Sequence, residues 1–352
     1  MPTSTVRSPF KFLDAYQKED KAFFFGREQE IEALYELSFE TNLIMLYGAS
    51  GTGKTSLINC GLSNKFQDTD WFDLFIRRGE NLNQSLEKAI REQAVTPIPA
   101  NIPLRRALKS LFYDYYKPIY LIFDQFEELF ILGDKKEQQQ FFQTLSELLQ
   151  LNLQLTVILS MREEYIAYLS DFEKVVPSLF DNRFRVESMK RASLEAVVSG
   201  TTKHFHIELE PEEKVVDQIL NNLWHKRSGV DLTNLQVYLD RLYTTYLKVP
   251  EANRDNMVFT PSLVDRVGEL TDVLSDFLDE QLKELENQMP EHKKTVPLDV
   301  LFEFVTNDAT KRSATVEAVK QELFKKKDIS SEDVDFCIDY FSSIRLFREL
   351  DE

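Results

Sequence analysis

One eight-residue stretch contains the residue types that wrap a phosphate group, and it reads Gly48-Ala49-Ser50-Gly51-Thr52-Gly53-Lys54-Thr55. It fits the pattern G-x-x-x-x-G-K-[ST], in which backbone N–H groups turn inward around the phosphates and glycine permits close approach. Lys54 can reach the β- and γ-phosphates, and the Thr55 hydroxyl can ligate Mg²⁺. We therefore predict that this loop, together with Ser56, binds the phosphates of a nucleotide and that Lys54 also acts in catalysis.

The distribution of glycine supports this prediction. Only ten of the 352 residues are glycine, and four of the ten lie within residues 48–61. A glycine-poor chain that concentrates glycine in one place needs unusual backbone geometry there. The alternative is an ordinary glycine turn, which the position between an apolar run at 43–47 and a helical pattern after it disfavours.

A carboxylate that can complete the metal site follows the apolar run 119–123. A phosphate loop of this kind needs an acidic partner at the end of a neighbouring strand, and we assign Asp124 to Mg²⁺ together with Thr55. We assign Glu127 to orienting the attacking water. Glu128 competes for that role, because spacing alone does not show which carboxylate faces the γ-phosphate. The alternative is that both glutamates begin a helix and only favour its dipole.

Two arginines flank further predicted strands. Arg162 ends the apolar run 156–161, where it can sense the γ-phosphate, or it can form a salt bridge to Glu163 or Glu164. Arg183 begins the last predicted strand, where it can act on the nucleotide of a neighbouring subunit in a ring or form a surface ion pair. Both are therefore candidate catalytic residues.

The apolar periodicity predicts the elements that position these residues. Strand-like runs alternate with helical patterns for some 150 residues, which predicts a parallel sheet with helices on both faces. The predicted strands are 43–47, 71–78, 118–124, 153–161 and 183–189, and the predicted helices are 28–40, 82–94, 104–116, 135–150 and 163–181.

The second half of the chain reads differently. From about Ala192 the strand signals stop and amphipathic helices follow. The last 55 residues contain three helical patterns, at 298–306, 315–326 and 332–343, and then a predicted strand at 346–352. Three helices and one strand predict a winged-helix-like domain, and because its second wing strand is missing we expect the chain to be a fragment of a longer protein.

Composition excludes several classes of protein. The chain has 59 acidic and 42 basic side chains, a net charge of −17, and this balance disfavours nucleic acid as a main partner. No run of 18 apolar residues predicts a membrane span, and the first residues lack the pattern of a secretory signal. Two cysteines far apart in the sequence suit a reducing compartment, so we expect a cytoplasmic protein.

Four segments in this order resemble the STAND branch of AAA+-related P-loop ATPases, and most closely the bacterial novel-STAND class: FFFGREQEIEAL, LYGASGTGKTSLINCGL, LIFDQFEELF and ILSMREEY. The resemblance covers about residues 8–250. It implies an α/β P-loop NTPase domain, an α-helical lid and a winged-helix-like domain, which we place at 1–190, 191–270 and 271–352. In that family the FGRE segment lies near the adenine, so Phe25, Gly26 and Arg27 become candidate base or ribose contacts. For Phe25 the alternative is a place in the core.

The same resemblance implies a switch controlled by ATP and ADP with Mg²⁺. Such proteins open and form homo-oligomers when a sensor domain meets its trigger, and many bacterial relatives act in defence against phage. We therefore expect slow, regulatory ATP hydrolysis, with sensor or effector domains on a longer chain or a partner protein. The segment 228–233 departs from the family, because it lacks the proline of the usual lid contact to adenine.

Two other functions remain alternatives. A DNA-handling AAA+ ATPase of the initiator or loader kind also carries a winged helix, but residues 271–352 contain 20 acidic against 11 basic side chains, with one compact basic run at Lys325–Lys327. A GTPase or small-molecule kinase is disfavoured because the chain lacks an N-K-x-D guanine signature.

Overall fold

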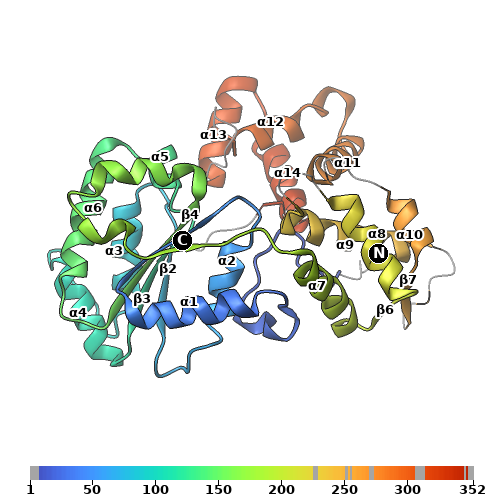
Figure 1. Cartoon of the computed structure of the whole chain (residues 1–352). Coiled ribbons are helices and arrows are strands. Elements are labelled where there is room, and N and C mark those ends of the chain that lie inside the picture. Colours follow the sequence, from blue (N-terminus) through green and yellow to red (C-terminus); the bar gives the residue numbers. More distant parts are fainter. Residues whose placement is uncertain are drawn as a thin grey trace. The chain divides into compact units, whose positions relative to one another are not determined.

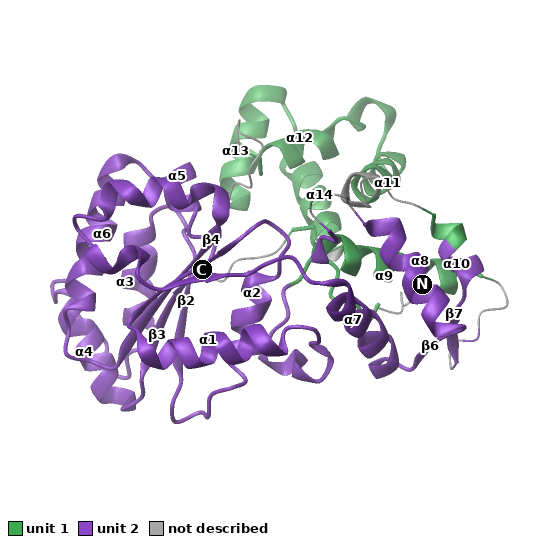
Figure 2. Cartoon of the chain, in the orientation of Figure 1, with its two compact units in different colours: residues 1–14, 233–249, 265–352 green, residues 15–232, 250–264 purple. Residues whose placement is uncertain are grey.

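The structure is a computed structural model that describes residues 8–224, 229–249, 253, 256–268, 273–305, 314–344 and 346–347. The chain forms two compact units (Figure 2). The sheet unit comprises residues 15–232 and 250–264, and the helical unit comprises residues 1–14, 233–249 and 265–352. The three-domain division predicted above stays a prediction.

Five strands form the main sheet of the sheet unit, in the order β2-β3-β4-β1-β5. Figure 1 shows this sheet with helices around it. Every pair in this sheet is parallel, as predicted. The strands are β1 (Leu43–Gly48), β2 (Phe72–Ile76), β3 (Ile119–Phe123), β4 (Leu155–Arg162) and β5 (Arg183–Arg185). β4 lies between β1 and β3, so the strand that ends at Asp124 is not the neighbour of β1 that the sequence led us to expect.

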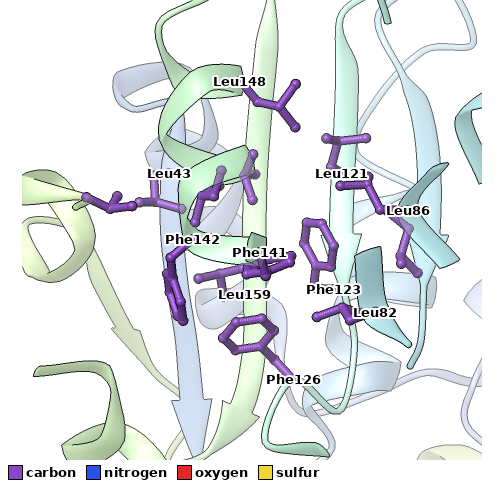
Figure 3. Packing of buried hydrophobic residues seen from close by; sticks show 14 of the residues in the cluster. Leu43, Leu82, Leu86, Leu121, Phe123, Phe126, Phe141, Phe142, Leu148 and Leu159 are labelled. Carbon is purple, nitrogen blue, oxygen red and sulfur yellow. The ribbon is translucent and has the colours of Figure 1, made fainter. Parts of the chain in front are cut away.

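Helices cover both faces of this sheet because side chains of successive strand residues point to opposite sides. Met45, Leu121 and Val157 pack with α3, α4 and α6, and this large core is shown in Figure 3. Ile44 and Ile122 pack on the other face, against α1 and the π-helix η2 that follows the glycine-rich loop. The helices are α1 (Glu28–Glu40), α2 (Lys54–Ser56), η2 (Leu57–Leu62), α3 (Leu82–Glu92), α4 (Leu104–Tyr115), α5 (Glu128–Ile131) and α6 (Lys135–Leu149).

The predicted helix at 163–181 is a pair of 3-10 segments, η3 (Glu163–Phe172) and η4 (Pro177–Phe180). A further 3-10 segment, η1 (Lys18–Phe23), precedes α1.

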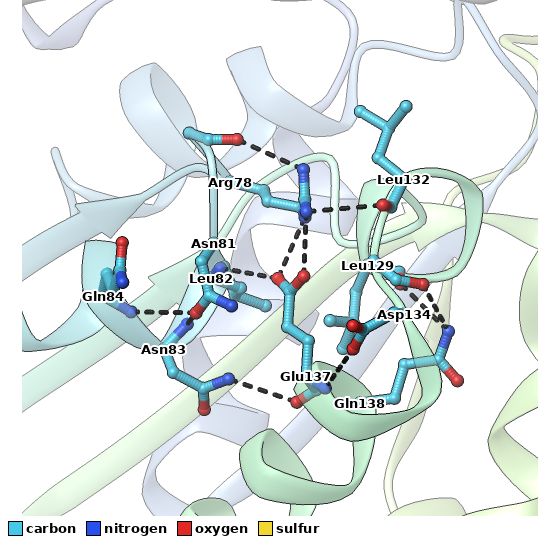
Figure 4. Close-up of polar contacts among 12 residues, drawn as sticks. Arg78, Asn81, Leu82, Asn83, Gln84, Leu129, Leu132, Asp134, Glu137 and Gln138 are labelled. Carbon is cyan, nitrogen blue, oxygen red and sulfur yellow. Dashed lines mark hydrogen bonds and ion pairs between the residues drawn. The ribbon is translucent and has the colours of Figure 1, made fainter.

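A buried charged residue joins the segment after β2 to α6 (Figure 4). Glu137 on α6 is 5% exposed. Its carboxylate accepts two hydrogen bonds from the Arg78 guanidinium, at 3.0 and 2.8 Å, and one from the Leu82 N–H at 2.7 Å. Leu82 begins α3, where a negative charge is favoured by the helix dipole. Glu137 thus holds the segment from Arg78 to Leu82, which follows β2 at the sheet edge that carries the site.

The expectation that strand signals stop near residue 192 is wrong. After α7 (Arg191–His204) a second, two-stranded sheet pairs β6 (Ile207–Leu209) with β7 (Met257–Phe259) in parallel. In the sequence, α8 (Glu212–Leu223) and α9 (Leu232–Leu247) lie between the two strands. Each strand has three residues, too few for an alternating pattern to be recognised, and the partners lie 50 positions apart in sequence.

The helical unit contains the three helices predicted near the end of the chain, and they are α12 (Val296–Phe302), α13 (Val316–Lys327) and α14 (Ser331–Ser343). They enclose a core that includes Val300, Leu323 and Phe341. The other elements of the second half are α9 (Leu232–Leu247), α10 (Pro261–Val267), α11 (Val273–Asn287) and η5 (Glu291–Lys293). The strand predicted at 346–352 lies outside the described residues, apart from Leu346 and Phe347, which form a bend. Within the described part of the chain, no helix has the length and apolar character needed to cross a membrane.

Candidate nucleotide-binding site

The glycine-rich loop joins the end of β1 to the start of α2. Gly51 adopts a φ of +73°, in the left-handed region that favours glycine. A Cβ atom on Gly48 would lie 2.3 Å from the carbonyl oxygen of Val186, so only glycine fits there. The loop is thus held close to the segment after β5, at the carboxyl ends of the parallel strands, where α/β proteins bind their ligands.

Lys54 points back into this loop. Its ammonium donates hydrogen bonds to the carbonyl oxygens of Gly48 and Ala49, at 2.9 and 2.8 Å. Burial lowers the pKa of Lys54, although the nearby Glu127 opposes the shift. An anion bound in the loop would favour the charged ammonium and relieve this cost, as a phosphate group would.

The predicted metal ligands lie together. The Thr55 hydroxyl donates to the two carboxylate oxygens of Asp124, at 3.0 and 3.2 Å. Asp124 is 3% exposed. Hydroxyl and carboxylate oxygens are ligands that Mg²⁺ accepts, so Thr55 and Asp124 would fit this ion. The described residues hold no group of three or more His, Cys, Asp or Glu side chains suited to a metal ion.

Arg77 is a residue of this site that the sequence analysis missed. Its guanidinium donates to one carboxylate oxygen of Asp124 from Nε at 3.1 Å and from Nη2 at 2.5 Å. Strands β2 and β3 pair with Ile76 opposite Phe123, so Arg77 and Asp124 each follow their strand by one residue at the same sheet edge. The available signal was that Arg77 and Asp124 both lie at the carboxyl end of a predicted strand, 71–78 and 118–124.

Glu127 and Arg162 form an ion pair. The Arg162 Nε lies 3.2 Å from one carboxylate oxygen of Glu127, and the Arg162 backbone N–H donates to the other at 3.2 Å. Arg162 therefore pairs with Glu127, whereas Glu163 pairs with Arg185 at 3.0 Å. Burial raises the pKa of Glu127, which is 6% exposed.

The two glutamates face different neighbours. Glu127 interacts with Arg162 at the end of β4, next to β1 and its loop, and its charge favours the protonated form of Lys54. Glu128 instead interacts with Glu127, with Arg77 and Arg78 after β2, and with Asp124. This arrangement favours Glu127 as the residue that orients water.

Arg27, in the FGRE segment, binds the backbone of the phosphate loop. Arg27 is 2% exposed, and its Nη2 donates to the carbonyl oxygens of Thr52 and Glu187, both at 2.8 Å. It also forms an ion pair with Glu30. Arg27 thus ties the loop backbone to the segment after β5, a role that the sequence did not indicate.

Phe25 and Gly26, which precede Arg27, pack against α7. A ring carbon of Phe25 lies 2.7 Å from the place that a Cβ on Gly200 would take. Gly26 has a φ of +83°. Their proposed contact with the base or ribose stays a prediction.

The remaining predicted residues lie around the loop. The Thr52 hydroxyl donates to the Ala49 carbonyl oxygen at 3.0 Å, and the Ser56 hydroxyl accepts a hydrogen bond from the Tyr16 N–H at 3.1 Å. Ser50 is exposed. Arg183 is also exposed, at the start of β5, and its action on a neighbouring subunit stays a prediction.

Glu128 gives a pH dependence that can be measured. Burial, with the nearby Glu127, raises the pKa of Glu128 from 4.5 to about 7. Between these values the folded protein keeps a proton that the unfolded chain releases, so stability falls as the pH rises through this window. We expect Glu128→Gln to stabilise the nucleotide-free protein by about 1 kcal/mol at pH 8, the shift being reduced by partial exposure, and to have no effect at pH 4.5. Urea unfolding of both proteins at the two pH values measures this difference, and an equal effect at both would contradict it.

A parallel sheet with a glycine-rich loop, a lysine and a threonine after its first strand, and a carboxylate at the end of another, defines a P-loop NTPase. Within that class, the chain belongs to the novel STAND NTPase 1 family, whose model matches residues 9–349.

Solved structures agree with this fold. The chain resembles the Walker-type ATPase of Pyrococcus abyssi with a TM-score of 0.51 and 16% identity, over 96% of this chain and 94% of that one. It resembles the ORC2 protein of Aeropyrum pernix, solved in ADPNP and ADP complexes, with a TM-score of 0.52 and 14% identity, over 91% and 86% of the two chains. For Cdc6p of Pyrobaculum aerophilum the TM-score is 0.51 and the identity 15%, over 90% and 86%. No curated protein sequence matches the chain.

Proposed function

We propose that this chain is the core of a signalling switch whose ATP or ADP content controls its opening and its assembly into homo-oligomers. The observation that carries the proposal is the contact between Thr55 and Asp124 beside the loop that holds Lys54. This arrangement suits the phosphates of a nucleotide and a magnesium ion. The ADPNP and ADP in the Aeropyrum pernix ORC2 structure support adenine nucleotides as the ligand.

The residues of the site would have the following roles in binding and hydrolysis. The loop N–H groups and Lys54 bind the β- and γ-phosphates, and Thr55 with Asp124 holds Mg²⁺, which would neutralise charge on the phosphate oxygens. Glu127 accepts a proton from the attacking water and orients it. Arg162, paired with Glu127, lies where it can sense the γ-phosphate. Hydrolysis serves as a slow timer in this proposal.

A switch of this kind requires nucleotide to bind two states of the protein with different affinity, by about 1–3 kcal/mol. A winged-helix-like domain at 271–352 and sensor or effector domains elsewhere would respond to that difference. From the likeness to bacterial novel-STAND proteins, we propose defence against phage as the setting.

Lys54→Ala tests the proposal. We expect the variant to bind ATP about 10- to 100-fold more weakly, since it loses a charged hydrogen-bond donor to the phosphates. Calorimetric titration measures the affinity, and light scattering during chromatography measures assembly with ATP and with ADP. Identical assembly of wild type and Lys54→Ala in both nucleotides would refute the switch.

A DNA-handling ATPase remains the second candidate, since the ORC and Cdc6 structures share the fold. The basic run at the end of α13 does not favour it, because Lys326 is paired with Glu303 and Glu322, and Lys327 with Asp299. Salt-sensitive duplex binding at micromolar or better affinity would support this candidate over the switch.

A further inference from the structure

The chain segment that leads into α9 lies directly on the phosphate loop, and both belong to the sheet unit. The Leu232 N–H donates to the Gly51 carbonyl oxygen at 3.1 Å. A methyl carbon of Leu232 lies 3.2 Å from the place that a Cβ on Gly53 would take. The segment therefore touches the loop at two of its glycines.

The residue before Leu232 brings a carboxylate to the same place. The two carboxylate oxygens of Asp231 lie 2.0 and 2.4 Å from the position that a Cβ on Gly51 would take. The carboxylate thus fills the space beside Gly51 that any larger residue would need. Because Gly51 sits within the phosphate-binding pattern, a negative charge lies against the loop that is built to receive phosphate.

The loop attracts anions through its N–H groups, the N-terminal end of α2 and Lys54. A nucleotide that enters the loop meets the Asp231 carboxylate as a like charge at short range, and the repulsion grows with the charge of the nucleotide.

We propose that Asp231 is a specificity-determining residue, which makes the loop discriminate between nucleotides by their charge. It opposes ATP more than ADP, and so links the presence of the γ-phosphate to the position of the segment that begins α9. This inference rests on the proposed function, because it assumes that the loop binds a nucleotide.

The test compares Asp231→Asn with wild type, because asparagine keeps the shape of the side chain and removes the charge. We expect affinity for MgATP to rise about tenfold and affinity for MgADP, which carries one negative charge fewer, to rise about threefold. Asp217→Asn is the control, since it removes the same charge from α8, where Asp217 pairs with Arg191. Thermal unfolding without nucleotide checks the fold of each variant, and Asp231→Ser provides a second variant that lacks the carboxylate.

Each outcome decides the question. Equal gains for MgATP and MgADP, equal gains in the Asp217→Asn control, or weaker binding would overturn the role of Asp231 while leaving the switch proposal intact. If wild type binds neither nucleotide, the proposed function itself fails, and this inference fails with it.

Discussion

Glu127→Gln is expected to lower the rate of ATP hydrolysis about 10²- to 10⁴-fold, because glutamine cannot accept a proton from the attacking water. The affinity for ATP should stay within about threefold of wild type, since the phosphates are bound by the loop and Lys54. Phosphate release over time measures the rate, and calorimetric titration measures the affinity. The separation of the two effects is what distinguishes a group that orients water from one that binds the nucleotide.

Glu128→Gln is the matched control, since it makes the same chemical change one residue away. Its side chain interacts with Arg77, Arg78 and Asp124, whereas Glu127 interacts with Lys54 and Arg162. We expect its hydrolysis rate to fall less than about tenfold. If Glu128→Gln loses hydrolysis and Glu127→Gln keeps it, the assignment of the two glutamates is reversed.

The phosphate loop and Asp124 could be predicted from the sequence because the signals for them are local. The strands that carry the loop and Asp124 are apolar runs of six and five residues. The first leads into the glycine-rich loop, and the second is followed at once by Asp124. Parallel strands end at one edge, so the meeting of Thr55 and Asp124 followed from the class of fold. The order of the strands could not be predicted, because no local sequence pattern indicates that β4 lies between β1 and β3.

The hydrogen-bond and ion-pair partners of Arg27 and Arg162 could not be predicted from the sequence. Arg27 reaches Thr52 and Glu187, which lie 25 and 160 positions away along the chain. Such contacts depend on how whole elements pack, and periodicity describes one element at a time. Arg162 shows the same limit. The adjacent Glu163 and Glu164 were the expected partners, yet its ion pair is with Glu127, in the turn after β3.

Glu137→Ala is expected to destabilise the sheet unit by about 3–5 kcal/mol, the largest stability effect that we predict. The substitution leaves the Arg78 guanidinium, whose side chain is 10% exposed, without its carboxylate. It also leaves the Leu82 N–H without its acceptor at the start of α3. A domain has about 5–15 kcal/mol of stability in total, so much of it would be lost. Urea unfolding followed by fluorescence measures the change, because Trp71, 6% exposed, reports on this unit.

Two further variants test whether Glu137→Ala destabilises the protein because it leaves a buried charge unpaired or only because it removes a contact. Glu92→Ala removes a carboxylate from the exposed pair with Lys88, 3.8 Å apart on α3, and should cost less than about 0.5 kcal/mol. The double variant Arg78→Met with Glu137→Leu should be more stable than Glu137→Ala, because it leaves no buried charge unpaired. If Glu137→Ala costs no more than Glu92→Ala, the buried pair does not hold the chain beyond β2. The course of that segment matters for the site because Arg77, bound to Asp124, immediately precedes Arg78.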